Sequence, residues 1–377
     1  MKAIFSLLLL LVSGYLPAQS ITASIQHDGL SRNYRVHVPS TYQAGIAAPL
    51  VFNLHGYTSN AQQQEFYSGM NAIADTAGFI LVYPDGVNNS WNSGFGASYS
   101  TGTDDVGFLS TLIDSISANY SIDSLRIYSC GMSNGGFMSF RLACDLQHRI
   151  AAVASVTGTM TQMQLDSCKG LRAVPILQIH GTQDATVPYN GSAISASVDA
   201  TLNFWRNLNQ CGSGIVHDTF PDLVAEGSTV SSQSQSCAVN TEVIHFKVAN
   251  GGHTWPGALS VPGLGITNQD INGSHEIWTF FKRHVRPASV PANNPDSPVE
   301  AQDLHASPNP FSDQVRLPSL ATKGRVEVYD TQGRLLFARE VSGRSQEEIY
   351  TSDWPSGMYL LRIEQSGHWS RQRLIKN

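Results

Sequence analysis

The chain has 377 residues, of which 41% are hydrophobic and 14% charged, and its formal net charge at pH 7 is −6. This length is sufficient for two domains, and the composition is that of an ordinary globular protein. The mildly acidic balance gives no indication of a nucleic-acid-binding surface, which would need clustered basic residues.

The first 18 residues have the pattern of a secretory signal peptide. Lys2 gives a short positive region, residues 3–12 are an apolar core, and the small residue Ala18 precedes the expected cleavage site. The apolar core is too short to cross a bilayer, and no later apolar stretch is long enough. We therefore expect an exported protein without a transmembrane segment, in which disulfide bonds can form.

Residues 19–285 alternate strand and helix patterns. Apolar, β-favouring segments predict strands at 34–38, 49–54, 79–83, 125–130, 151–156, 174–180 and 243–248. Helical patterns follow several of these strands, at 61–78, 104–120, 135–145 and 197–210. Such alternation predicts an α/β fold, in which helices cover both faces of a mostly parallel sheet.

The remainder of the chain has a different pattern. Residues 286–306 are rich in Pro, Ala, Asn and Ser, which is typical of a linker. Residues 307–377 contain short apolar segments separated by glycine-containing turns and show no helical period, which predicts a small β-sandwich.

One serine stands among glycines between a predicted strand and a predicted helix, in the segment GMSNG at 131–135. The segment fits G-x-S-x-G, the nucleophile elbow of α/β-hydrolases. A Cβ atom two residues before or after Ser133 would collide with the opposing element, so glycine is needed there. An ordinary tight turn is the alternative, but the strand before and the helix after favour Ser133 as a nucleophile.

A serine nucleophile needs a base, and the base needs an orienting acid, which in this fold follow in the order Ser, Asp or Glu, His. Asp184 follows the predicted strand 174–180 and a glycine turn. His253 follows the strand 243–248 in a Gly-Gly loop. We expect these two residues to complete a triad with Ser133, although Asp184 could instead cap a turn. His180 and His245 lie inside predicted strands and are expected to be structural.

Two backbone N–H groups are expected to form the oxyanion hole. One belongs to Asn134, directly after the nucleophile, and the other to Tyr57, in the loop after the strand 49–54. The side chain of His55 is expected to brace that loop. An aromatic, neutral substrate rim is expected from residues near these loops, namely Tyr57, Trp91, Phe95, Tyr99 and Trp255; the alternative is that these aromatic side chains merely pack the loops.

The chain contains the cysteines Cys130, Cys144, Cys168, Cys211 and Cys237. Pairing of near neighbours suggests the disulfides Cys144–Cys168 and Cys211–Cys237, but the sequence alone leaves the connectivity open. Cys130 would remain as a buried, unreactive thiol. No metal-binding spacing of Cys or His occurs, so no metal is expected. The serine mechanism expected above requires no cofactor.

Several motifs occur together and in order, namely NLHGYTSN, YPDGVNNSWN, DDVGFLSTLID, GMSNGG, IHGTQDATVPYNG and GGHTWPG. With them the chain resembles the secreted polyhydroxybutyrate depolymerase/feruloyl esterase group of α/β-hydrolases over roughly residues 24–285. The resemblance implies Ser133 as nucleophile, Asp184 as orienting acid and His253 as base, and it is consistent with both suggested disulfides. The chain lacks the cysteines that some relatives carry between SWN and DDVGF.

The C-terminal segment resembles a type IX secretion sorting domain, through ASPNPFSDQVRL, VEVYDTQGRLL, DWPSGMYLLRI and the terminal RLIKN. This resemblance implies that residues 307–377 engage the type IX secretion machinery and direct export across an outer membrane. The alternative is a substrate-binding module.

We thus expect a secreted, monomeric serine esterase, extracellular or at the cell surface, that removes feruloyl or acetyl groups from plant polysaccharide. The aromatic rim and the absence of a long apolar lid motivate this substrate class. Depolymerisation of polyhydroxybutyrate is the first alternative, because a hydrophobic polyester would also favour an aromatic rim. A peptidase and a catalytically inactive glycan-binding protein are further alternatives.

Overall fold

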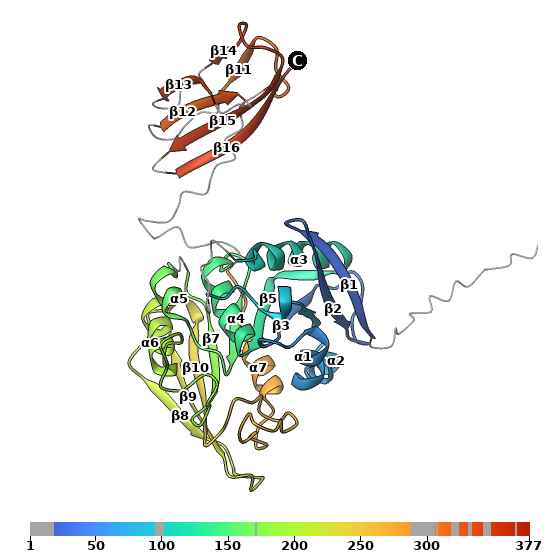
Figure 1. Cartoon of the computed structure of the whole chain (residues 1–377), viewed down its shortest axis with the longest axis vertical. Helices are drawn as coiled ribbons and strands as arrows, with labels where there is room; N and C mark the ends of the chain where they lie inside the picture. Colours follow the sequence, from blue (N-terminus) through green and yellow to red (C-terminus); the bar gives the residue numbers. More distant parts are fainter. Residues whose placement is uncertain are drawn as a thin grey trace, which may run out of the picture. The chain divides into compact units, whose positions relative to one another are not determined.

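The structure is a computed structural model that describes residues 19–94, 102–169, 172–287, 306, 308–317, 324–330, 334–341, 348–365 and 368–377 (Figure 1). The predicted signal peptide 1–18 and most of the predicted linker 286–306 lie outside these residues. The chain divides into two compact units, Met1–Val290 and Pro291–Asn377, and each is described by itself.

The first unit is built on one large sheet with strand order β1-β2-β4-β3-β5-β6-β7-β10-β9-β8. The strands from β4 to β10 in this order run parallel, and antiparallel pairs extend the sheet at both edges. The strands are β1 (Gln19–His27), β2 (Leu30–Val38), β3 (Ala48–Leu54), β4 (Ile80–Pro84), β5 (Ile122–Met132), β6 (Ala152–Val156), β7 (Ile176–Gly181), β8 (Ile215–Thr219), β9 (Thr229–Ser236) and β10 (Glu242–Ala249).

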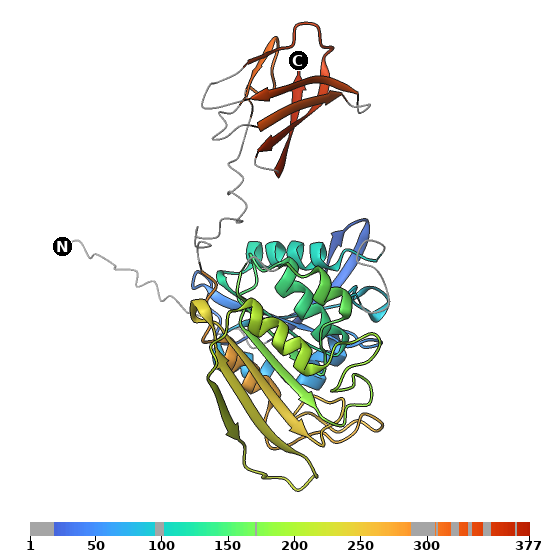
Figure 2. The same ribbon diagram turned by 90° about the vertical axis from the view of Figure 1, so that its left-hand side faces the viewer.

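Helices cover both faces of this sheet (Figures 1 and 2). They are α1 (Ala61–Ser68), α2 (Asn71–Ala77), α3 (Asp105–Asn119), α4 (Asn134–Asp145), α5 (Gln162–Ser167), α6 (Val198–Leu208) and α7 (Gly273–Phe281). All seven residues of β3 are buried. Leu50 and Phe52 belong to the core beneath α3, α4 and α6, while Val51 belongs to the core beneath α1, α2 and α7. The predicted α/β fold is therefore confirmed.

The helical segment predicted at 61–78 is two helices. Gly69 adopts a left-handed conformation with φ 60°, ends α1 and donates its N–H to the Glu65 carbonyl. Such a residue is the usual C-cap of a helix, and glycine adopts it without steric cost. The strands β8 and β9 were not predicted, because β8 is exposed along its length and β9 is mostly polar.

The second unit consists of two antiparallel sheets around a small apolar core. One sheet pairs β11 (Gln314–Arg316) with β14 (Glu348–Tyr350). The other contains, in order, β13 (Leu335–Val341), β12 (Gly324–Asp330), β15 (Gly357–Gln365) and β16 (His368–Lys376). The all-β C-terminal region expected from the sequence is therefore present. In the described parts of the chain, no helix is long and apolar enough to cross a membrane.

Two disulfides join the suggested pairs of cysteines. Cys144, in α4, bonds Cys168 at the end of α5, and Cys211, after α6, bonds Cys237 after β9. Both suggested pairings are thus confirmed. Cys130 is a free, buried cysteine, and burial raises the pKa of its thiol well above the usual range. This thiol is therefore protonated and unreactive near neutral pH.

Reduction of the disulfides should lower the melting temperature of the protein. The bonded cysteines are separated by 24 and 26 residues, and a loop of this size stabilises a fold by about 3 kcal/mol. Calorimetry with and without reductant measures the effect. As a control, alkylation of the unfolded but unreduced protein should modify Cys130 alone; alkylation of Cys144 or Cys211 would contradict the pairing.

Candidate active site

Ser133 stands in the sharp turn between β5 and α4. Its backbone has φ 53° and ψ −119°, a conformation that is unusual for a residue other than glycine. The Ser133 N–H donates to the Val156 carbonyl at 2.8 Å, and the Ser133 carbonyl accepts from the Phe137 N–H at 3.0 Å. Both bonds hold the turn, so the side chain is presented at the carboxyl edge of the sheet and is partly exposed.

The glycines around Ser133 allow the turn to lie against neighbouring backbone. A Cβ on Gly131 would lie 2.7 Å from the Leu54 carbonyl oxygen, and one on Gly135 would lie 2.1 Å from the same atom. A Cβ on Gly136 would lie 2.2 Å from the Ser155 hydroxyl oxygen. The steric reason for glycine that the sequence predicted is thus confirmed, with β3 as the opposing element.

The expected acid and base lie after two neighbouring strands. β7 and β10 run parallel, so the loops that follow them meet at one edge of the sheet. Their backbones touch, because a Cβ on Gly181 would lie 2.2 Å from the Gly251 carbonyl oxygen. His253 Nδ1 donates to Asp184 Oδ2 at 2.8 Å, and both side chains are buried.

Asp184 is held as a carboxylate. Its Oδ1 accepts the N–H groups of Thr186 at 2.9 Å and Val187 at 2.8 Å. Burial alone would raise the pKa of the Asp184 carboxyl, but hydrogen bonds from His180 and His253 hold this pKa well below its usual range. With Nδ1 of His253 donating to the carboxylate, Nε2 of the same ring carries the lone pair that can accept a proton.

The structure brings Asp184 and His253 into contact, and the Ser133 hydroxyl makes no hydrogen bond within the described residues. The hydrogen bond between a serine nucleophile and its base is often long in a free enzyme and shortens when substrate binds.

The loop after β3 lies directly beside the nucleophile. A Cβ on Gly56 would lie 3.5 Å from Ser133 Cβ, so the next residue, Tyr57, is close to the same point. The Tyr57 N–H donates to no carbonyl among the described residues. Asn134 is the first residue of α4, where a helix leaves its N–H groups unpaired. The two segments next to Ser133 therefore each have a backbone N–H without a carbonyl partner in the described part of the chain.

His55 braces this loop, as the sequence predicted. Its side chain is fully buried, and its Nε2 accepts the Gly86 N–H at 2.9 Å. Nδ1 therefore carries the hydrogen and donates to the Gly56 carbonyl at 2.7 Å. Burial lowers the pKa of His55, which keeps the ring neutral. The ring thus links the loops after β3 and β4 without taking part in proton transfer.

The sequence profile described as "Esterase PHB depolymerase" matches residues 33–243. The chain belongs to this family of esterases. The match spans more than half of the chain and includes β3, the elbow and β7. The protein is therefore a carboxylic-ester hydrolase, and the family resemblance expected from its motifs is confirmed.

Named relatives of this esterase agree with the family. Feruloyl esterase D of Neurospora crassa is 32% identical over 279 residues, which cover 70% of this chain and 86% of that protein. The bifunctional acetylxylan esterase/xylanase of Neocallimastix patriciarum is 27% identical over 255 residues, which cover 67% of this chain and 34% of that protein. The solved structure of acetyl xylan esterase from Aspergillus awamori has a TM-score of 0.51 at 13% identity, over 70% of this chain and 99% of that chain. This last likeness shows the fold.

A second profile, described as a secretion system C-terminal sorting domain, matches residues 306–377 of the esterase. The prediction of a type IX sorting domain is confirmed, with a start one residue earlier than expected. The esterase is accordingly secreted or held at the cell surface.

The side chain of Asn134 ties the elbow of the esterase to a neighbouring loop, which the sequence did not indicate. Its Oδ1 accepts the Trp91 N–H at 2.6 Å, and its Nδ2 donates to the Ser93 hydroxyl at 3.0 Å. The Trp91 indole N–H in turn donates to the His55 carbonyl at 3.0 Å. A chain of hydrogen bonds thus connects the two segments that carry the unpaired N–H groups.

The prediction that Trp91 and Trp255 form part of an aromatic substrate rim is wrong. Trp91 is 3% exposed and packs on His55, with ring centroids 5.0 Å apart. Trp255 is 1% exposed, and its indole N–H donates to the Ser274 hydroxyl at 3.2 Å. Neither ring offers a face for stacking, since each supports a loop from within.

Tyr57 is the expected rim residue that the structure exposes, at 67% of its surface. Phe95 and Tyr99 lie outside the described residues.

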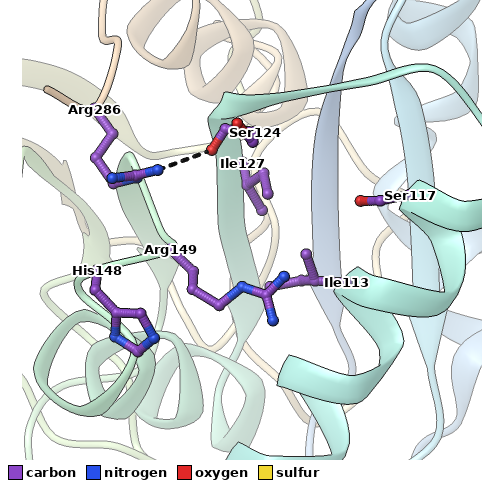
Figure 3. Close-up of a pocket in the computed structure, with 7 residues that line it drawn as sticks. All are labelled: Ile113, Ser117, Ser124, Ile127, His148, Arg149 and Arg286. Atoms are coloured by element: carbon purple, nitrogen blue, oxygen red, sulfur yellow. Dashed lines mark hydrogen bonds between the residues drawn. The ribbon is translucent and has the colours of Figure 1, made fainter. Parts of the chain in front are cut away.

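The first unit also has a cavity of about 390 Å³, and Figure 3 shows the residues that line it. It is lined by side chains from α3, the start of β5, the segment between α4 and β6, and the end of the first unit: Ile113, Ser117, Ser124, Ile127, His148, Arg149 and Arg286. Arg286 donates to the Ser124 carbonyl at 3.3 Å. Ser124 and Ser133 are at opposite ends of β5, roughly 30 Å apart at about 3.3 Å per residue. The cavity is therefore not part of the candidate active site.

Proposed function

We propose that the esterase acts through a Ser–His–Asp triad. Ser133 attacks the ester carbonyl while His253 Nε2 takes its proton, and Asp184 holds the imidazole in the required tautomer. The N–H groups of Tyr57 and Asn134 donate to the oxyanion. His253 then protonates the leaving alcohol, and a water molecule repeats the sequence to release the acid and restore Ser133.

The observation that carries this proposal is the hydrogen bond of 2.8 Å from His253 Nδ1 to Asp184. It leaves Nε2 as the proton acceptor at the edge of the sheet where the strained Ser133 is presented. The approach of Gly56 to Ser133 supports the assignment of the oxyanion hole.

We assign the catalytic machinery to residues 19–285, with residues 286–306 as a linker and 307–377 as a separate sorting domain. All the residues that the mechanism uses belong to the first compact unit.

As substrate we propose feruloyl or acetyl esters of plant polysaccharide. Two relatives support this class, since one is named a feruloyl esterase and another an acetylxylan esterase/xylanase. The exposed ring of Tyr57 beside Ser133 could stack on a phenolic acid or a sugar ring.

A polyester of hydroxybutyrate is the second candidate substrate, because the matching family is described as a PHB depolymerase. Parallel assays on methyl ferulate, acetylated xylan and polyhydroxybutyrate granules separate the two, with the Ser133→Ala variant as the blank. Release of ferulate or acetate without clearing of the granules supports the first candidate. Clearing of the granules alone would make the polyester the first candidate substrate. Cleavage of a peptide anilide alone would reject both candidates in favour of a peptidase.

Tyr57→Ala should weaken hydrolysis of methyl ferulate more than hydrolysis of p-nitrophenyl acetate. The variant keeps the backbone N–H but loses an aromatic stacking contact, which is worth about 0.5–1.5 kcal/mol, or roughly 2- to 12-fold in kcat/KM. The matched control is Tyr350→Ala in the second unit, where a tyrosine of similar exposure is removed. Equal losses of kcat/KM on both substrates would show that the Tyr57 side chain is not part of the binding site.

A further inference from the structure

Asp184 has a second histidine beside it. His180, on β7, is fully buried, and its Nε2 lies 3.3 Å from Asp184 Oδ2, the same oxygen that accepts from His253. The His180 Nε2 also lies 2.8 Å from the Val187 carbonyl oxygen. The Nε2 atom of His180 therefore contacts both Asp184 and Val187, the two ends of one turn.

The surroundings of His180 decide which nitrogen carries its hydrogen. The Val187 carbonyl can only accept, so Nε2 must donate. On the other side of the ring, Gln178 Nε2 lies 3.0 Å from His180 Nδ1 and 2.8 Å from the Gly158 carbonyl oxygen. Because that carbonyl also only accepts, the amide nitrogen of Gln178 faces it and donates to Nδ1. Both arguments give the neutral tautomer with hydrogen on Nε2.

Resting on the triad proposed above, we infer that His180 is a positioning residue: its Nε2–H bonds the Val187 carbonyl at 2.8 Å and also faces Asp184 Oδ2 at 3.3 Å, the oxygen that accepts from His253. Oδ2 of the carboxylate then accepts the His253 N–H at 2.8 Å and faces the His180 N–H at 3.3 Å, while Oδ1 accepts two backbone N–H groups. All of these donors stabilise the ionised acid.

The shared oxygen has a consequence for the base. The His180 N–H offsets part of the negative charge on Asp184 Oδ2, so this oxygen attracts the His253 N–H less strongly. His180 thereby weakens the stabilisation of the imidazolium that forms during catalysis. Removal of the His180 donor should therefore make His253 easier to protonate in the free enzyme. The acid limb of kcat/KM, which reports that protonation, would move to higher pH.

Other polar groups around His180 do not compete for this role. Tyr189 meets the His180 ring edge-on at 5.9 Å, and Lys247 lies over the Tyr189 ring at 5.6 Å. From β10, His245 is opposite Gln178 in the sheet, and burial together with the nearby His180, Arg206 and Lys247 lowers the pKa of His245 to about 3. His245 is thus neutral across the working range of the enzyme.

The test compares His180→Phe with His180→Gln, whose amide nitrogen can replace the Nε2 donor, and with His245→Phe as the matched control on the neighbouring strand. Profiles of kcat/KM against pH are measured on p-nitrophenyl acetate. We expect the acid limb of His180→Phe to move up by roughly half a pH unit or more, and the limbs of the other two variants to stay near wild type. A limb that stays in place or moves down in His180→Phe would overturn the inference.

A measurement on the wild-type enzyme keeps the inference testable where His180→Phe does not fold. Side-chain nitrogen NMR should show His180 in the Nε2–H tautomer, and the Nδ1–H tautomer would overturn the inference. Failure of the triad itself would be distinguishable, because Asp184→Asn would then retain activity. An inactive Asp184→Asn with an unmoved acid limb in His180→Phe would reject the role of His180 alone.

Discussion

Ser133→Ala should fold as the wild type does and hydrolyse esters about 10⁶-fold more slowly, the usual cost of removing a serine nucleophile. The Ser133 hydroxyl makes no hydrogen bond within the described residues, so its loss removes no stabilising contact. Alanine keeps the Cβ, so the strained backbone at φ 53° is no less favourable than before. Turnover of p-nitrophenyl acetate and the melting temperature are the two measurements.

The control is Ser124→Ala, at the exposed start of the same strand, which should keep full activity. A fluorophosphonate reagent gives an independent readout, because it labels an activated serine. The peptide that contains Ser133 should carry the label in the wild type and none in Ser133→Ala. A tenth of the wild-type rate in Ser133→Ala would exclude Ser133 as the nucleophile.

Asp184→Asn should reduce kcat by about 10⁴-fold while the fold is retained. The N–H groups of Thr186 and Val187 need an acceptor, so the amide oxygen of the new side chain will face them. Its NH₂ group then faces the ring nitrogens of His253 and His180. A donor opposite His253 Nδ1 favours the tautomer with hydrogen on Nε2, and that nitrogen can no longer take a proton from a serine.

The matched control for this variant is Asp218→Asn, on the exposed strand β8, which should leave the rate unchanged. An Asp184→Asn variant with more than about a hundredth of the wild-type kcat would show that the acid lies elsewhere. The melting temperature of Asp184→Asn distinguishes a wrong His253 tautomer from a disordered loop, because a wrong tautomer leaves the melting temperature near that of the wild type.

The positions of the elbow and of the Asp184 and His253 loops could be predicted because each has a local signal. Glycine two residues on either side of Ser133 reports a close backbone approach, and the apolar runs of β7 and β10 are each followed within three residues by glycine. Parallel strands bring such ends to one edge without further information. The contact between Asp184 and His253 then follows from the pairing of β7 with β10.

Burial of individual side chains could not be predicted in the same way. Trp255 follows His253 closely, yet it is buried in the core and its indole N–H donates to Ser274 at the start of α7, which is distant in sequence. The contact of His180 with Asp184 was missed because a histidine inside a buried strand gives no local signal that differs from ordinary packing. The polar strand β9 lacked the apolar pattern on which strand prediction depends.

The backbone contact between the elbow and β3 limits how this enzyme can be redesigned. A side chain at Gly135 has no space, because its first carbon would lie 2.1 Å from the Leu54 carbonyl oxygen. Randomised libraries that include positions 131, 135 and 136 would consist largely of inactive clones. Position 57 has space for other side chains, because the Tyr57 side chain is exposed. Its proposed role in catalysis belongs to the backbone N–H. Directed evolution toward a new acyl group should therefore begin by saturating that position.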